Sequence, residues 1–275
     1  MTSARKNLAL RTASASVLLP IAVGAAWAGE PYFTALVALF ALVALWEFRN
    51  MAGAAGWGFA AETAFTLGPA LVLRGLAGAR ASAKVDFALA LLVAASLAIR
   101  LIRREHRGRF LGWSAAIGGA LYVGGLAAFF PALRALPDGF IWVMLAFTAT
   151  WSYDMGAFVG GTLFGRRPLM PHISPAKTWE GVATGVAAVA ACLGVFLAFL
   201  PIEPWHIAVA GPGFAAAAQI GDLLESAIKR EAGVKNSGRL VPGHGGILDR
   251  VDSLLFTAPF VYLFAVLVLR MGPLS

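Results

Sequence analysis

The chain has 275 residues, of which 59% are hydrophobic and only 13% are charged, and its mean hydropathy is +0.77. Soluble domains carry about 25% charged residues, so this composition predicts a protein whose solvent is the lipid bilayer. It excludes an intrinsically disordered chain, a coiled coil and a nucleic-acid-binding domain. The excess of 22 Lys and Arg over 14 Asp and Glu fits basic loops at a membrane surface rather than a nucleic-acid partner. The single cysteine, Cys192, excludes a disulfide framework and a cysteine-based metal site.

Nine apolar runs follow one another along the chain, each near the length of about 20 residues that a helix needs to cross a bilayer. They fall at about 12–28, 32–48, 57–73, 86–102, 112–132, 139–160, 179–200, 205–225 and 252–271. We therefore expect an all-α, polytopic integral membrane protein with about nine transmembrane helices, forming one membrane domain over residues 1–275. Within it, residues 1–132 carry spans without a recognised motif, whereas residues 139–271 carry the polar motifs described below.

The distribution of Lys and Arg predicts the orientation of these spans, because cations collect in cytoplasmic loops. A cytoplasmic N-terminus places every Lys and Arg on the inside except five. These five are Arg74, Arg80, Lys84, Arg134 and Arg270. We therefore expect a multi-pass protein of the cell inner (plasma) membrane with its N-terminus in the cytoplasm. The N-terminal segment also has features of a secretory signal peptide, whose cleavage would leave the downstream topology unchanged.

Polar residues interrupt the apolar pattern at three places near the predicted cytoplasmic face. The first is Asp154, at the end of the sixth span; a carboxylate inside a membrane costs about 2.5–3.5 kcal/mol, so it marks either a functional site or an interfacial acid. The second is a segment in which Ser174 and Pro175 predict a helix start, as N-cap and first helical residue. Lys177 and Thr178 would then lie in the first turn, where a cation beside the helix dipole favours a bound phosphate.

The third and densest polar stretch joins the eighth and ninth predicted spans. If the eighth span continues as a helix, Asp222, Ser226 and Lys229 line one of its faces. Asp249 and Asp252 share a face at the start of the ninth span, where the helix dipole favours carboxylates. Because a loop of about 20 residues joins these antiparallel helices, we expect Asp222 and Asp249 to converge.

The connecting loop is basic and rich in glycine. Its cations, with those at its two ends, are Lys229, Arg230, Lys235, Arg239 and Arg250. Glycines flank His244 and let backbone N–H groups approach a ligand closely. This combination suits a complex of metal and polyphosphate, because Mg²⁺ takes one or two carboxylates and completes its shell with phosphate oxygens and water. A solvated basic loop on anionic headgroups is the simpler alternative, but it does not explain Asp222 inside a span.

Together these motifs resemble the signature of the phosphatidate cytidylyltransferases, also called CDP-diacylglycerol synthases. The signature reads here Ser226, Lys229-Arg230, Lys235-Asn236, Pro242-Gly243-His244-Gly245-Gly246 and Leu248-Asp249-Arg250-Val251-Asp252. The segments around Asp154, Lys177 and Asp222 are also similar, so the resemblance spans residues 154 to 253. Two residues depart from the family pattern: Asn236 stands where the family usually has Asp, and Phe158 where Tyr is usual.

The resemblance implies transfer of a cytidylyl group from CTP to phosphatidic acid, giving CDP-diacylglycerol and pyrophosphate in phospholipid biosynthesis, at a site facing the cytoplasm. It implies Mg²⁺ at Asp222, Ser226 and Asp249, a second cation such as K⁺, and a homodimer. The implied catalytic residues are Asp222, Lys229, Asp249 and Asp252. The implied substrate-binding residues are Asp154, Ser174, Lys177, Thr178, Arg230, Lys235, Gly243, His244, Gly245, Gly246 and Arg250, with Lys177 on the phosphatidate headgroup.

Two other functions stay open at this point. A CTP-dependent enzyme that acts on an isoprenoid lipid acceptor would share the nucleotide motifs, and hydropathy does not separate it from the first reading. A secondary transporter would also carry ionisable residues in its spans. Transporters usually show duplicated halves and midplane sites, whereas the polar residues here cluster at one membrane face late in the chain.

Overall fold

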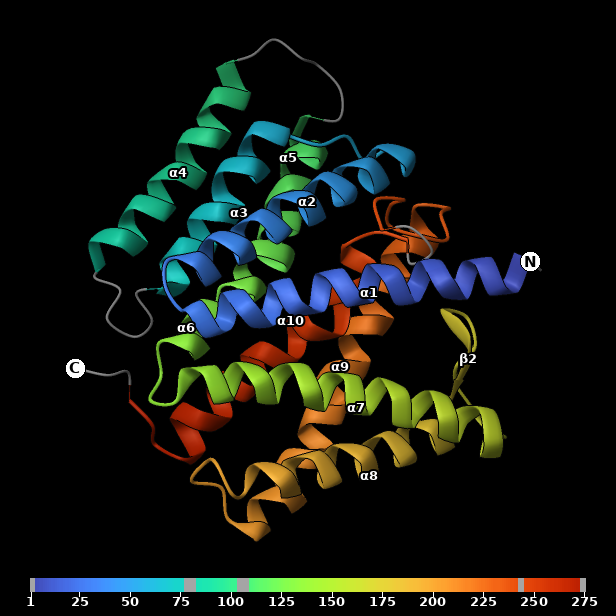
Figure 1. Cartoon of the computed structure of the whole chain (residues 1–275). Coiled ribbons are helices and arrows are strands. Elements are labelled where there is room, and N and C mark those ends of the chain that lie inside the picture. Colours follow the sequence, from blue (N-terminus) through green and yellow to red (C-terminus); the bar gives the residue numbers. More distant parts are fainter. Residues whose placement is uncertain (1–2, 77–82, 103–108, 242–244, 273–275) are drawn as a thin grey trace. The chain divides into compact units, whose positions relative to one another are not determined.

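A computed structural model describes residues 3–76, 83–102, 109–241 and 245–272 of the chain (Figure 1). These residues are mostly helical, with one short β-hairpin. The chain divides into two compact units, Met1–Ala132 with Glu231–Arg250 and Leu133–Arg230 with Val251–Ser275. The predicted all-α class is therefore confirmed, and each unit is described below by itself.

The first unit is built from the N-terminal helices. They are α1 (Ser3–Ala28), α2 (Tyr32–Ala54), α3 (Ala61–Leu76), α4 (Ala83–Ile102), α5 (Arg109–Gly119) and the π-helix η2 (Ala120–Gly125), followed by α6 (Phe129–Arg134) at the boundary of the unit. Helix α3 packs against both α2 and η2. A Cβ on Gly124 of η2 would overlap the backbone of Gly68 on α3, so these two helices meet at their backbones. In lipid there is no hydrophobic driving force between helices. Small residues at such a crossing allow the close van der Waals packing that holds the helices together instead.

The second unit contains the remaining elements. They are α7 (Gly139–Phe164), β1 (Pro168–Met170), β2 (Ser174–Thr178), α8 (Trp179–Phe196), most of α9 (Pro204–Glu231) and of α10 (Leu248–Leu263), and the π-helix η3 (Phe264–Val268). Strands β1 and β2 pair antiparallel, with Pro168 opposite Thr178 and Met170 opposite Ser174. The hairpin therefore links the ends of α7 and α8.

Glycines bring α7 and α8 together along their length. Gly156 and Gly160 on α7 are four residues apart and so lie on one face of the helix. A Cβ on Gly160 would overlap Thr184 of α8, and one on Gly185 would overlap the ring of Tyr153. The Thr184 hydroxyl donates a hydrogen bond to the carbonyl of Gly156 at 2.9 Å. This helix pair thus combines backbone approach with an interhelical hydrogen bond, as expected for helices packed in a bilayer.

Helix α7 also holds α9 and α10 through buried polar side chains. The Tyr153 hydroxyl donates to Oε1 of Gln219 on α9 at 2.8 Å. The hydroxyls of Thr150 and Thr257 on α10 lie 2.8 Å apart and share a hydrogen bond. Both pairs satisfy groups that would otherwise be unpaired in an apolar interior.

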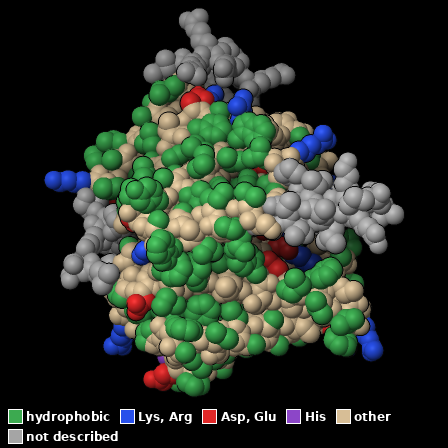
Figure 2. All heavy atoms as spheres, viewed as in Figure 1, with side chains coloured by type: hydrophobic (Ala, Val, Ile, Leu, Met, Phe, Trp, Pro, Cys, Tyr) green, Lys and Arg blue, Asp and Glu red, His purple; other side chains and the backbone are tan. Residues whose placement is uncertain are grey.

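Five helical segments in the described part of the chain are long and apolar enough to cross a membrane. They are Tyr32–Ala54, Phe110–Arg134, Trp179–Phe196, Pro204–Glu231 and Leu248–Val268. Hydrophobic side chains cover much of the face shown in Figure 2, and large ones such as Trp27, Phe158 and Leu267 are exposed. Soluble monomers rarely expose apolar surface on this scale, so the chain is a multi-pass membrane protein. Helices α1, α3, α4 and α7 coincide with the other predicted runs, and the count of nine spans stays a prediction.

The predicted helix start at Ser174 and Pro175 is wrong. Residues Ser174–Thr178 form strand β2, and α8 begins at Trp179 with Thr178 as its N-cap. The Thr178 hydroxyl accepts a hydrogen bond from the N–H of Gly181 at 3.2 Å. Pro175 fits a two-stranded hairpin because its missing N–H costs nothing on a free strand edge, and Thr178 is among the residue types that cap helices. Lys177 consequently extends from a strand instead of the first helical turn.

The α7–α8 contact makes a testable prediction for Gly160. A Gly160→Leu substitution should destabilise the protein by about 1–3 kcal/mol, because the new side chain has to displace Thr184. Thermal unfolding in detergent measures the change. Gly194→Leu is the matched control, since nothing lies within 4 Å of a Cβ at that position of α8. Equal melting temperatures for the two variants would contradict the packing described here.

Candidate functional site

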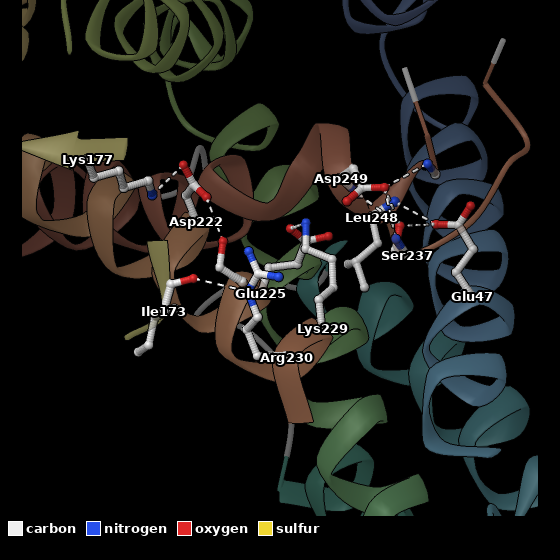
Figure 3. Close-up of polar contacts among 12 residues, drawn as sticks. Glu47, Ile173, Lys177, Asp222, Glu225, Lys229, Arg230, Ser237, Leu248 and Asp249 are labelled. Carbon is white, nitrogen blue, oxygen red and sulfur yellow. Dashed lines mark hydrogen bonds and ion pairs between the residues drawn. The ribbon is translucent and has the colours of Figure 1, made fainter. Parts of the chain in front are cut away.

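The acidic face of α9 meets the hairpin at an ion pair. Nζ of Lys177 on β2 lies 2.5 Å from Oδ2 of Asp222 on α9 (Figure 3). One turn further along α9, the Ser226 hydroxyl donates to Oδ1 of Asp222 at 3.3 Å. The predicted helical face of Asp222 and Ser226 is therefore confirmed. The two ion-paired side chains are 20% and 36% exposed, so the pair stays accessible to a ligand.

A second basic side chain ties the hairpin to α9. Nε of Arg230 donates to the carbonyl oxygen of Ile173, just before β2, at 3.3 Å (Figure 3). Arg230 is exposed and lies two turns beyond Asp222 on the same helix. The hairpin is thus attached to α9 at two points. The hydrogen bond from Arg230 to the backbone of Ile173 supports the ion pair in keeping Lys177 beside Asp222.

Lys229 has a buried partner that the sequence analysis left without a role. Its Nζ donates to Oε2 of Glu225, one turn earlier on α9, and Glu225 is only 1% exposed (Figure 3). A buried carboxylate needs a cation or several donors. Glu225 therefore fixes the ammonium group of Lys229 on the face that also carries Asp222.

Asp252 joins this group through a close contact between α9 and α10. A Cβ on Gly221 would overlap the carbonyl of Asp252, so the two helices touch at their backbones beside Asp222. The Asp252 side chain is partly buried near the start of α10. The second unit thus brings the acidic residues Asp222 of α9 and Asp252 of α10 to one contact between these two helices.

Among the described residues, no three His, Cys, Asp or Glu side chains form a group that could hold a metal ion without other ligands. The acids that do lie together offer only oxygen donors. Mg²⁺ in phosphate-transfer sites uses one or two carboxylates, with phosphate and water completing its shell. The donor set therefore has the oxygen chemistry that Mg²⁺ accepts, provided that other ligands complete its shell.

Asp249, in the first unit, is oriented by the glycine-rich loop. Its Oδ2 accepts hydrogen bonds from the N–H of Ser237 at 3.0 Å, from the hydroxyl of Ser237 at 2.9 Å and from the N–H of Gly246 at 2.8 Å. Gly245 has φ +90°, and a Cβ there would crowd the same oxygen, so this position requires glycine. Gly245 and Val241 exchange backbone hydrogen bonds and close the loop. The N–H groups of Gly245 and Gly246 thus have partners within the chain.

Glu47 is a site residue that the sequence analysis missed. It lies on α2 and is fully buried, and its oxygens accept hydrogen bonds from the Ser237 hydroxyl and from the N–H groups of Ile247 and Leu248 (Figure 3). The sequence does mark Glu47, because it is a carboxylate at the end of an apolar run and such a group needs a partner. Its partner is 190 residues or more away in the chain, which no local pattern reveals.

The other predicted site residues have simpler surroundings. Asp154, Lys235 and Arg250 are exposed, and so are the two positions that depart from the family pattern, Asn236 and Phe158. Ser174 is half-buried at the start of β2, and Thr178 caps α8. Gly243 and His244 lie outside the described residues. Asp222 and Asp249 belong to different units, and their convergence stays a prediction.

Comparison with known proteins gives a consistent picture over nearly the whole chain. A phosphatidate cytidylyltransferase of Brucella suis is 36% identical over 269 residues, which cover 94% of this chain and 93% of the relative. One of Synechocystis sp. is 34% identical over 289 residues, covering 94% and 97%. One of Bacillus subtilis is 43% identical over 146 residues, covering 52% and 54%. The profile of the Cytidylyltransferase family matches residues 9–268, so the similarity includes the N-terminal spans, and the chain belongs to the Cytidylyltransferase family.

Proposed function

We propose that this chain is a phosphatidate cytidylyltransferase, which transfers a cytidylyl group from CTP to phosphatidic acid and releases CDP-diacylglycerol and pyrophosphate. The observation that carries the proposal is the ion pair of Lys177 with Asp222, on a helix that also holds the ion pair of Lys229 with Glu225, in a chain of this family. The full-length relatives in Brucella suis and Synechocystis are named for this reaction. The reaction would serve phospholipid biosynthesis.

The chemistry places mainly electrostatic demands on the protein. An oxygen of the lipid phosphate forms a bond to the α-phosphorus of CTP while the bond to pyrophosphate breaks. Because two anions must meet, the barrier depends on charge neutralisation and position. The nucleophile is already ionised, so the step needs no strong general base.

The basic residues divide between the two substrates in this proposal. Lys177 binds the phosphatidate headgroup, while the acyl chains stay in the bilayer. The cations assigned to the triphosphate are Lys229, Arg230, Lys235 and Arg250. Asp154, Ser174 and Thr178 are assigned to the substrate site, and Gly243, His244, Gly245 and Gly246 are assigned to binding of the nucleotide.

We extend the proposal to Mg²⁺, held by Asp222, Ser226 and Asp249, with a second cation such as K⁺. The backbone contact between Gly221 and Asp252 supports a bound cation, because it brings Asp252 near Asp222 and a cation would stabilise two neighbouring carboxylates. When bound, Mg²⁺ would stabilise negative charge on the phosphates and on the leaving pyrophosphate. Asp252 would then act as a catalytic acidic residue beside the metal ligands.

The proposal also includes the location of the enzyme. CTP is supplied from the cytosol, and the predicted orientation places the basic loops on that side of the inner membrane. We therefore place the active site at the cytoplasmic face, with nine spans and a cytoplasmic N-terminus. A homodimer is proposed from the family resemblance.

Asp222 gives the first test of the activity. Asp222→Asn should lower the formation of lipid-linked cytidylyl product from labelled CTP, phosphatidic acid and Mg²⁺ by about 100-fold or more, because the carboxylate charge is lost. Purified protein in detergent is the material. Asp138→Asn is the matched control, since Asp138 has a left-handed backbone that Asn tolerates and its side chain makes no capping hydrogen bond.

The same assay separates the competing functions. Product with phosphatidic acid, and none with an isoprenoid ether lipid phosphate or a polyprenyl phosphate, supports the proposal. Product only with an isoprenoid acceptor would replace the substrate assignment. No product from wild-type protein with any acceptor, together with solute uptake into vesicles, would favour a transporter.

Lys177 tests the lipid assignment separately. Lys177→Met keeps the length of the side chain and removes its charge, so the KM for phosphatidic acid should rise about 10- to 100-fold, as expected for a lost charge-assisted contact. The KM for CTP should change by less than about threefold. Lys84→Met, at an exposed position of α4, is the control. A larger change in the KM for CTP than for the lipid would move Lys177 to the nucleotide.

Cysteine labelling tests the orientation. Because Cys192 is the only cysteine, Cys192→Ala provides a background without thiols. In intact cells, an impermeant maleimide should label Glu30→Cys between α1 and α2, and it should label Lys235→Cys only after lysis. The reverse pattern would place the basic loop outside and remove its access to CTP.

A further inference from the structure

Glu47 is a buried carboxylate in an apolar helix, and the proposed reaction gives it no role. It is 0% exposed, although α2 is one of the segments that could cross a membrane. Burying an ionised carboxylate is unfavourable unless hydrogen bonds or a cation compensate for the lost water. The role of Glu47 is therefore inferred from the groups that compensate its carboxylate.

Glu47 binds the beginning of α10. Its Oε1 accepts the N–H of Ile247 at 3.0 Å, and its Oε2 accepts the N–H of Leu248, the first residue of the helix, at 2.8 Å. These N–H groups have no partner within the helix, and the positive end of the helix dipole favours an anion there. A Cβ on Gly238 or on Gly246 would overlap the Glu47 carboxylate, so both loop segments approach it at the backbone.

The Ser237 hydroxyl connects Glu47 to Asp249. Its Oγ lies 3.1 Å from Oε2 of Glu47 and 2.9 Å from Oδ2 of Asp249. A hydroxyl has one proton, so it donates to one of these carboxylates at a time. Oγ also accepts the N–H of Asp249 at 3.3 Å. Ser237 is therefore placed between the two acids, in contact with both.

A helix cap that served stability alone would need only the backbone N–H groups of α10. Glu47 in addition contacts Ser237, whose own N–H and hydroxyl both bind Oδ2 of Asp249. Gly246, the third donor to that oxygen, packs against the Glu47 carboxylate. The three donors described for Oδ2 of Asp249 thus belong to residues in contact with Glu47.

We propose that Glu47 is a positioning residue for Asp249. By holding Ser237, Gly246 and the first turn of α10, it fixes the direction in which the Asp249 carboxylate presents its charge. The inference rests on the proposed function, in which Asp249 is a ligand of the metal–nucleotide complex. It adds to the catalytic site a residue from α2, in the part of the sequence without recognised motifs.

The test compares Glu47→Gln with Glu62→Gln in purified protein. The amide of Glu47→Gln points an N–H group at N–H and O–H donors, whereas Glu62 is an exposed acid of the same unit, paired with Arg100. Glu47→Gln should lower kcat by about 10-fold or more and raise the Mg²⁺ concentration for half-maximal activity by about 10-fold, in the range found for residues that orient metal ligands. The KM for phosphatidic acid should stay within about twofold, and Glu62→Gln should behave as wild type.

Ser237→Ala and the double variant separate positioning from stability. Ser237→Ala removes the hydroxyl donor to Asp249 but keeps the backbone N–H donor, so it is the milder change. It therefore tests the inference even if Glu47→Gln does not fold. It should show the same shift in Mg²⁺ dependence, and the double variant should be no worse than the more severe single one, because both act through Asp249. The rise in melting temperature on adding Mg²⁺ with CTP, which does not require turnover, should shrink in both variants.

Three outcomes would overturn the inference. The first is a Mg²⁺ dependence of Ser237→Ala that equals that of wild type. The second is a loss of activity in the double variant that equals the product of the two single losses. The third is a lower melting temperature of Glu47→Gln with unchanged kcat. Absence of Mg²⁺-dependent product from wild type and from Glu62→Gln would instead contradict the proposed function, so the two failures are distinguishable.

Discussion

The constraint on which the functional residues depend is the cost of a carboxylate on an apolar helix. In a bilayer, water does not compensate an ionised side chain, so the protein has to supply a cation or several hydrogen-bond donors. Asp222 and Glu225 on α9 have the ammonium groups of Lys177 and Lys229. Glu47 on α2 has two backbone N–H groups and a hydroxyl. Asp222 and Glu47 are paired with other parts of the chain, so each of them identifies the segment that folds against it.

Glycines allow the segments that carry these partners to approach the acids closely. Gly221 lets the backbone of α10 approach α9 next to Asp222, and Gly238 and Gly246 let the loop reach the Glu47 carboxylate. Any larger residue at these positions would move the partner that the acid needs. Glycine in this chain is thus used less for flexibility than for close backbone approach, as is usual for helices packed in lipid.

Sequence patterns predicted the features that depend on local spacing. Hydropathy located the helices, and the spacing of Asp222 and Ser226 placed them on one face of α9, where they are hydrogen bonded. Ser174 was misassigned because a Ser-Pro step fits a helix start as well as a strand edge, and only pairing with β1 decides between them. Glu47 was missed because its partners follow it by 190 residues or more.

The two acids proposed as metal ligands are held by partners of different kinds, and this difference bears on their roles. Asp222 is paired with the cation of Lys177, which a metal ion would compete with and replace. Oδ2 of Asp249 is held by neutral N–H and O–H donors, whose contacts do not depend on an ion pair. Under the proposed function, the negative charge of Asp222 would be shared between Lys177 and a cation, whereas neutral donors would keep Oδ2 of Asp249 in place. Asp222 is thus held by an ion pair and Asp249 by neutral hydrogen-bond donors. Glu47 contacts the residues that supply the donors to Asp249.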